Sequence, residues 1–108
     1  MNIKYKVIYS PLALEDLRSI YLYISDTLKA KVAATTQVNA IRKAVRLLQT
    51  LPERFVMVDD EDLKRLKMHK MPVKNYVVFY LVDKEKSIVN IVRIFYGGRD
   101  IDVALKDN

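Results

Sequence analysis

The sequence predicts an α+β domain in which an antiparallel helical hairpin packs on a largely antiparallel four-stranded sheet, in the order β-α-α-β-β-β. The chain opens with a short segment of period two, continues with two long segments of helical periodicity, and ends with three segments of strand character. Two helices joined by a short connection form a hairpin. Because each has an apolar stripe, the hairpin must bury these stripes on the sheet.

The first strand is expected over Ile3–Tyr9, where apolar residues alternate with Lys4 and Lys6. Ser10-Pro11 then supplies an N-cap hydroxyl and a proline at the first helical position. The helix that follows should reach about Thr27, because apolar residues recur at spacings of four, three and four, at Ala13, Leu17, Ile20 and Ile24.

A second helix is expected after a cap at Asp26 or Thr27. Proline cannot continue a helix, so this one should stop at Leu51-Pro52. Its apolar stripe consists of Val38, Ile41, Val45 and Leu48.

Three strands should complete the fold. Alternation over Leu63–Met71 predicts a strand with one basic face, and Tyr76–Val82 is apolar throughout, which is typical of a central strand covered on both faces. Ile88–Tyr96 reads as a similar strand that ends at Gly97-Gly98. The last residues, Asp100–Asn108, fit either a short helix capped by Asp100 or an irregular tail.

The composition indicates one globular domain over residues 1–108 with a formal net charge of +6. There is no cysteine, which excludes disulfides, thiolate metal sites and cysteine nucleophiles. Neither a signal peptide nor an apolar run of bilayer length is present, so a cytoplasmic protein without membrane contact is expected. No motif calls for a cofactor.

The basic residues are grouped, since no acid occurs between Asp26 and Glu53 or between Asp62 and Asp83. Solvated faces of amphipathic elements explain the alternation but not the missing acids, so we favour an anion-binding or partner-binding surface. Its candidate residues are Arg42, Arg46, Arg65, Lys67, Lys70, Lys74, Arg93 and Arg99.

Two further features invite a chemical interpretation. His69 is the only histidine and lies among lysines, where it is either a proton donor or a packing residue. The acidic run Asp59–Asp62 is interpreted as a solvated loop rather than a metal site, because consecutive side chains diverge. We therefore expect no metal.

The string from Val73 to Asp83 and the string from Val89 to Asp100 resemble the closing hairpin of the RelE/ParE toxins of type II toxin-antitoxin systems. The opening strand, Ser10-Pro11 and the helix bearing Tyr23-Ile24 are similar as well. The resemblance covers essentially the whole chain. It implies a small bacterial toxin of a plasmid stabilisation system, neutralised by a cognate antitoxin.

One branch of this family cleaves messenger RNA on the ribosome without metal, and another poisons DNA gyrase. In the ribonuclease branch an arginine follows the central-strand tyrosine, where this chain has Val77, and a tyrosine lies near Val103–Leu105, where it has none. Arg99 matches a second arginine of that branch, and Lys67, His69 and Lys70 complete the set that would be catalytic in a ribonuclease.

The departures and the long hairpin favour a ParE-like toxin that acts on gyrase through a protein interface. The alternatives are a RelE-like, metal-independent endoribonuclease and a non-toxic partner or corepressor of the antitoxin. All three predict an acidic or amphipathic antitoxin segment over the basic sheet face.

Overall fold

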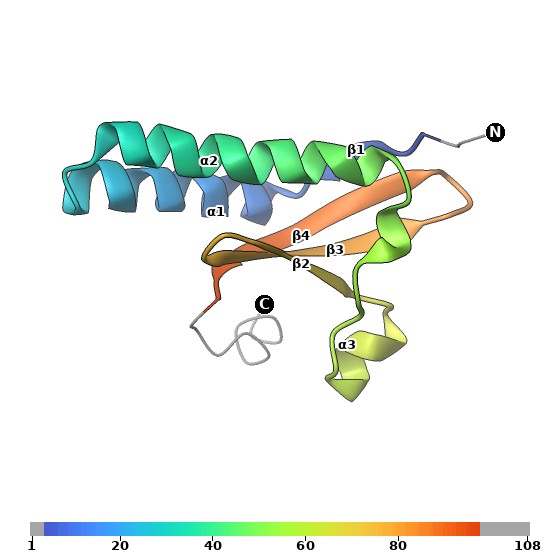
Figure 1. Ribbon diagram of the computed structural model, residues 1–108. Coiled ribbons are helices and arrows are strands. Elements are labelled where there is room, and N and C mark those ends of the chain that lie inside the picture. Colours follow the sequence, from blue (N-terminus) through green and yellow to red (C-terminus); the bar gives the residue numbers. More distant parts are fainter. Residues whose placement is uncertain (1–3, 98–108) are drawn as a thin grey trace.

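The computed structural model describes residues 4–97, in which a helical hairpin covers one face of a four-stranded sheet (Figure 1). This is the α+β fold and the element order that the sequence predicts, with one short helix added before the second strand. Residues 98–108, and with them the expected C-terminal helix, lie outside the described part. The elements are β1 (Lys6–Tyr9), α1 (Pro11–Leu22), α2 (Lys31–Arg46), α3 (Glu61–Arg65), β2 (His69–Val73), β3 (Tyr76–Asp83) and β4 (Ile88–Tyr96).

The first helix begins as its sequence predicts. Ser10 is the N-cap, its side-chain oxygen accepts a hydrogen bond from the Ala13 backbone N–H, and Pro11 occupies the first turn. After Leu22 the chain continues into a π-helical turn, Tyr23–Thr27, in which the Leu28 N–H donates to the Tyr23 carbonyl.

The expected cap of the second helix at Asp26 or Thr27 is wrong, because both residues belong to this π-helical turn. Helix α2 instead starts after Ala30, without a side-chain cap, and the 3₁₀ turn Leu47–Gln49 follows its last residue. Leu51 then adopts a left-handed conformation with φ of 48°. The helical run itself ends at Gln49, since Thr50 is extended, two residues before the Leu51-Pro52 step where the sequence predicts the stop.

The sheet has the strand order β1-β4-β3-β2, with β1 parallel to β4 and the other pairs antiparallel. Strand β1 pairs only with the first half of β4, and the second half lies beside α1. Opposite the Phe79–Tyr80 step the register shifts from Arg93 to Ile91, which makes Val92 the extra residue of a β-bulge.

The two faces of the sheet belong to two separate apolar clusters, as alternation along a strand requires. The helix-facing cluster joins α1 and α2 to residues such as Val78, Tyr80 and Ile91. The cluster on the opposite face, called the open face below, contains Val58, Leu63, Met68, Phe79 and Phe95. Strand β3 is therefore covered on both faces, which confirms the prediction.

The expected strand over Leu63–Met71 is wrong in its first half, and the acidic run is not simply a loop. Asp60 caps the five-residue helix α3 by accepting from the backbone N–H groups of Asp62 and Leu63. Acidic residues occupy the first turn of this helix and Lys64 and Arg65 the last, the order that the helix dipole favours. Within residues 4–97, no helix is both long and apolar enough to cross a bilayer.

Candidate functional site

His69 lies inside the protein and not on a basic face. It is 5% exposed, its ring stacks on Tyr80 with centroids 5.2 Å apart, and it lies opposite Tyr80 in the strand register. Its Nδ1 is 2.9 Å from the Lys67 carbonyl oxygen, which can only accept, so Nδ1 carries the proton. The histidine acts here as a packing residue beside the helix-facing core.

The stacked Tyr80 is anchored in turn, because its hydroxyl donates a hydrogen bond to the Pro52 carbonyl. Burial raises the pKa of Tyr80 to about 12. The stacked His69 and Tyr80 rings are thus tied to the segment between α2 and α3, which contains Pro52.

The lysines expected beside His69 are dispersed. Lys67 follows α3 with a left-handed φ of 59°, and Lys74 has a left-handed φ of 54° in the turn between β2 and β3. Only Lys70 lies on the open face, opposite Phe79 in the register, and Arg65 belongs to α3. The structure therefore does not bring Lys67, His69 and Lys70 together, and Arg99 lies outside the described residues.

Arg93 is engaged in an ion pair. Its Nε is 2.8 Å from Asp16 Oδ2 and its second guanidinium contact to Asp16 measures 2.9 Å, while the Ile94 N–H donates to the same carboxylate. The hydrogen bond to Asp16 raises the pKa of Arg93, against the opposing effect of burial. Asp16 thereby satisfies both the arginine and a backbone donor of β4 that has no strand partner.

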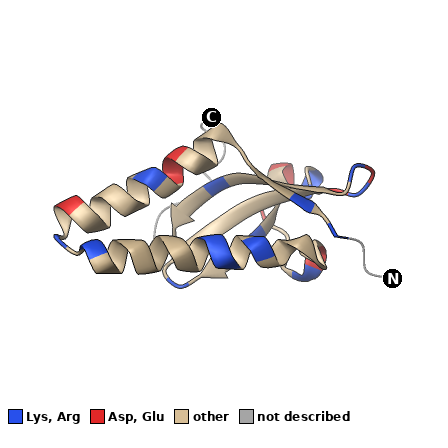
Figure 2. Cartoon of the chain, turned by 90° about the horizontal axis from the view of Figure 1, so that it is seen from above, with Lys and Arg blue, Asp and Glu red and all other residues tan. Residues whose placement is uncertain are grey.

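Arg42 and Arg46 lie on the other side of the molecule, on α2. Figure 2 shows basic patches along this helix and no acidic one, in agreement with its sequence. Together with Tyr9, Val7, Val45 and Gln49 they line a hollow of about 180 Å³ between α2 and β1. The candidate basic residues thus occupy several surfaces instead of one sheet face.

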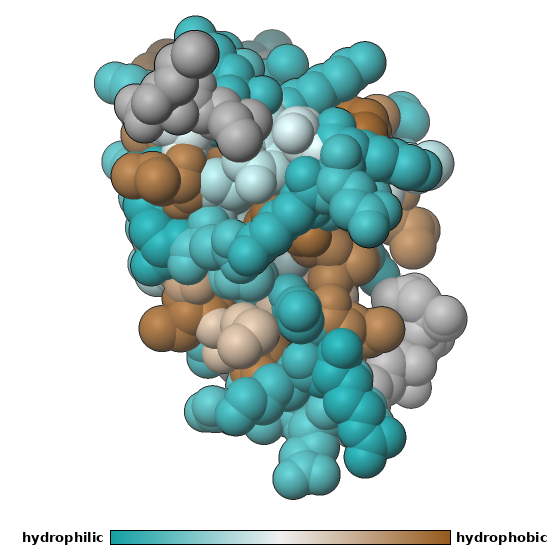
Figure 3. Space-filling model, turned by 90° about the vertical axis from the view of Figure 1, so that its right-hand side faces the viewer, coloured by the Kyte–Doolittle hydropathy of each residue, from teal (hydrophilic) through white to brown (hydrophobic). Residues whose placement is uncertain are grey.

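The open face carries an apolar cluster in which Phe79 and Phe95 are buried and Val77 is partly exposed. Val77 and Phe95 lie opposite each other, the Phe79 and Phe95 rings are 6.0 Å apart, and Leu81 and Val92 pack against the same cluster. Further apolar side chains are exposed between α2 and α3, at Leu51 and Val56, and Figure 3 shows such patches separated by hydrophilic side chains.

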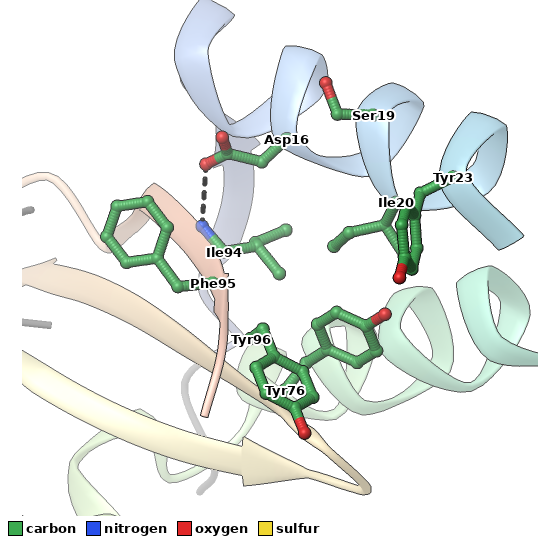
Figure 4. A pocket seen from close by; sticks show the side chains of 8 residues that line it. All are labelled: Asp16, Ser19, Ile20, Tyr23, Tyr76, Ile94, Phe95 and Tyr96. Atoms are coloured by element: carbon green, nitrogen blue, oxygen red, sulfur yellow. Dashed lines mark hydrogen bonds between the residues drawn. The ribbon is translucent and has the colours of Figure 1, made fainter. Parts of the chain in front are cut away.

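A second hollow, of about 460 Å³, lies between α1 and the ends of β3 and β4 and is lined mainly by aromatic and aliphatic residues (Figure 4). Ile20 and Ile94 point toward one another, and Tyr23, Tyr76 and Tyr96 lie beside them. Tyr23 and Tyr96 are more than half exposed, and the Tyr76 and Tyr96 rings meet edge to face at 5.9 Å. We call this the tyrosine hollow.

Burial raises the pKa of Tyr76, with Tyr23 and Tyr96 acting in the same direction, so its hydroxyl stays protonated at neutral pH. The hollow can therefore accept an apolar side chain and offer hydroxyl donors at its rim. The sequence does not predict this hollow, because it places Tyr76 and Tyr96 at the ends of two strands and gives them no surface role. No group of acidic and histidine side chains suited to a metal ion occurs in residues 4–97.

Comparison with known proteins agrees with this fold. The chromosomal ParDE system of P. aeruginosa has a TM-score of 0.70 at 18% identity, covering 86% of this chain and 96% of that one. The RelBE2 complex of Mycobacterium tuberculosis gives 0.63 at 20% identity, covering 87% and 99%. The archaeal RelE-RelB complex from Pyrococcus horikoshii gives 0.61 at 18%, covering 89% and 98%.

No curated protein sequence matches the chain significantly. The family model for the ParE toxin of the type II toxin-antitoxin system parDE, however, matches residues 7–101. That match spans most of the sequence, including helices α1, α2 and α3, strands β2, β3 and β4, and all of β1 except Lys6. The chain therefore belongs to the ParE toxin family, within the RelE/ParE superfamily of type II toxins.

Proposed function

We propose that this toxin inhibits growth by acting on DNA gyrase in the cytoplasm through a protein interface, and that a cognate antitoxin neutralises it. The observation that carries the proposal is Val77, a partly exposed residue at the edge of the apolar cluster of the open face, which stands at the position of the phosphate-binding arginine of the ribonuclease branch. A partly exposed valine at this position suits a protein partner better than a phosphodiester.

Metal-free RNA cleavage requires a base for the 2′-hydroxyl, an acid for the leaving oxygen and positive charge for the phosphorane. On the open face of the described residues, Lys70 lies beside apolar neighbours, while His69 is buried near the opposite face and Arg93 is neutralised by Asp16. This arrangement disfavours an acid-base pair.

The RelE-like alternative rests on Lys70 and Arg99, and on the two RelE-type complexes among the structural relatives. Induction of the toxin without antitoxin, followed in parallel by primer extension and a DNA-damage reporter, separates the two activities. We expect DNA damage with intact message. New message ends that disappear in Arg99→Ala would establish the ribonuclease instead, and normal growth would support a non-toxic partner.

We further propose that an apolar segment of the antitoxin docks in the tyrosine hollow. The printed descriptions of the structural relatives name toxin-antitoxin systems and complexes, and exposed tyrosines around a concave apolar site are typical of binding hot spots. Tyr23→Ala with Tyr96→Ala should weaken antitoxin binding, measured by calorimetry, by roughly 10- to 100-fold.

The matched control is Leu47→Ala, which truncates a similarly exposed apolar side chain at the far end of α2. It should leave antitoxin affinity unchanged. If the tyrosine variant binds as tightly as the unchanged toxin, the antitoxin docks elsewhere.

A further inference from the structure

The hollow between α2 and β1 has a composition different from that of the tyrosine hollow, and the two share no residue. Arg42 and Arg46 are four positions apart on α2, so their side chains lie on the same face of the helix. Tyr9, at the end of β1, forms the opposite wall. Two guanidinium groups and one hydroxyl therefore surround a small space.

Tyr9 can serve as a hydrogen-bond donor in this hollow. It is half-buried, and burial raises its pKa although the nearby Arg42 and Arg46 charges oppose the rise. Its hydroxyl consequently remains protonated at neutral pH. All three groups line the same hollow.

The positive charge in the hollow is not compensated within residues 4–97, where neither Arg42 nor Arg46 forms an ion pair. Helix α2 carries no acidic residue, and like charges four residues apart on a helix repel each other. A bound anion would remove this repulsion. Arg93, by contrast, already has its carboxylate partner.

The size of the hollow limits the ligand. At about 180 Å³ it is smaller than the roughly 300–1,000 Å³ of sites that enclose drug-sized molecules. It therefore suits a single anionic group, and paired guanidinium groups match the geometry of phosphate oxygens.

We propose that Arg42, Arg46 and Tyr9 bind one backbone phosphate of a nucleic acid. A polymer is favoured over free phosphate because the basic residues continue along the exposed side of α2 with Lys43. The site is independent of the gyrase proposal. It shares no lining residue with the tyrosine hollow.

The test measures binding of the full-length toxin to a labelled 20-base-pair duplex by fluorescence anisotropy over a salt series. Arg42→Gln with Arg46→Gln should weaken binding at least tenfold and lower the slope of log K against log salt by about 1. Lys29→Gln with Lys31→Gln removes the same charge at the opposite end of α2, outside the hollow, and should have a clearly smaller effect. Equal losses in the two variants would overturn the site.

Tyr9→Phe removes only the hydroxyl and should weaken duplex binding about three- to tenfold with an unchanged thermal midpoint. Unaltered duplex affinity in this variant would remove Tyr9 from the site. Inorganic phosphate, followed by NMR at the backbone amides of α2 and β1, separates the two phosphate sources. If the duplex binds no more tightly than inorganic phosphate, the nucleic-acid proposal fails, whatever the gyrase assay shows.

Discussion

Among single residues, Asp16 is the one that links α1 to β4, because its carboxylate accepts hydrogen bonds from both the Arg93 guanidinium and the Ile94 N–H. Both charged side chains are about 85% buried. Asp16→Ala leaves the Arg93 charge buried without a partner and should lower the free energy of unfolding by about 3 kcal/mol in urea titration. Glu15→Ala, at the exposed neighbouring position, should change it by less than about 0.5 kcal/mol.

Equal stability of these two variants would show that the ion pair contributes little. The pair could not be predicted from sequence, because its members are 77 positions apart and Arg93 reads as one of many basic residues. The only local signal is an acidic residue within the otherwise apolar contact face of the first helix.

Tyr80 makes stability depend on pH in alkaline solution. Its folded-state pKa of about 12 exceeds the ordinary value of 10, so the folded state retains a proton that the unfolded chain loses. Its contribution is therefore complete below pH 10 and is lost as pH rises through 12. Tyr80→Phe should cost about 1–2 kcal/mol at pH 7, because the Pro52 carbonyl loses its donor.

Urea titrations at pH 8 and pH 11 check both effects. The stability of Tyr80→Phe should fall less between these pH values than that of the unchanged chain, although the raised pKa values of Tyr9 and Tyr76 leave some loss in both. Parallel losses would contradict the assignment to Tyr80.

Ser10 links β1, α1 and β4 at the scale of secondary-structure elements. Its hydroxyl oxygen accepts from the Ala13 N–H, and the hydroxyl donates to the carbonyl of Val92, the extra residue of the bulge. Ser10→Ala should therefore lower the thermal midpoint and reduce the free energy of unfolding by about 1–2 kcal/mol. Ser19→Ala, exposed within the same helix, is the control and should be neutral; similar losses in both would argue against the cap.

The elements could be predicted from sequence wherever periodicity persists over enough residues. The apolar stripe of α1 and the apolar run of β3 are both long, and the structure confirms the helix and the strand that they predict. The strand predicted over Leu63–Met71 is wrong in its first half. The end of the short helix α3 and the turn after it happen to place apolar and basic residues alternately, as a strand would. Asp60, followed by acidic and then basic residues, is the capping and charge order that could have identified α3.

For the molecule as a whole, the sequence predicts the fold better than it predicts the candidate site. Family membership follows from the order of strands and helices, which the sequence carries, and the family-model match confirms it. The dispersal of the basic residues and the tyrosine hollow depend on tertiary packing. Tyr76 and Tyr96 look like core residues in the sequence, yet they line a surface formed only when α1 crosses the end of β4.

We propose above all that this ParE-family toxin acts on gyrase through a protein interface and not by cutting RNA. The most direct measurement is DNA supercoiling by purified gyrase at increasing toxin concentration. We expect supercoiling to be blocked or cleaved gyrase-bound DNA to accumulate, with reversal on adding the antitoxin. Unchanged supercoiling at a large molar excess of toxin that arrests growth in cells would contradict the claim.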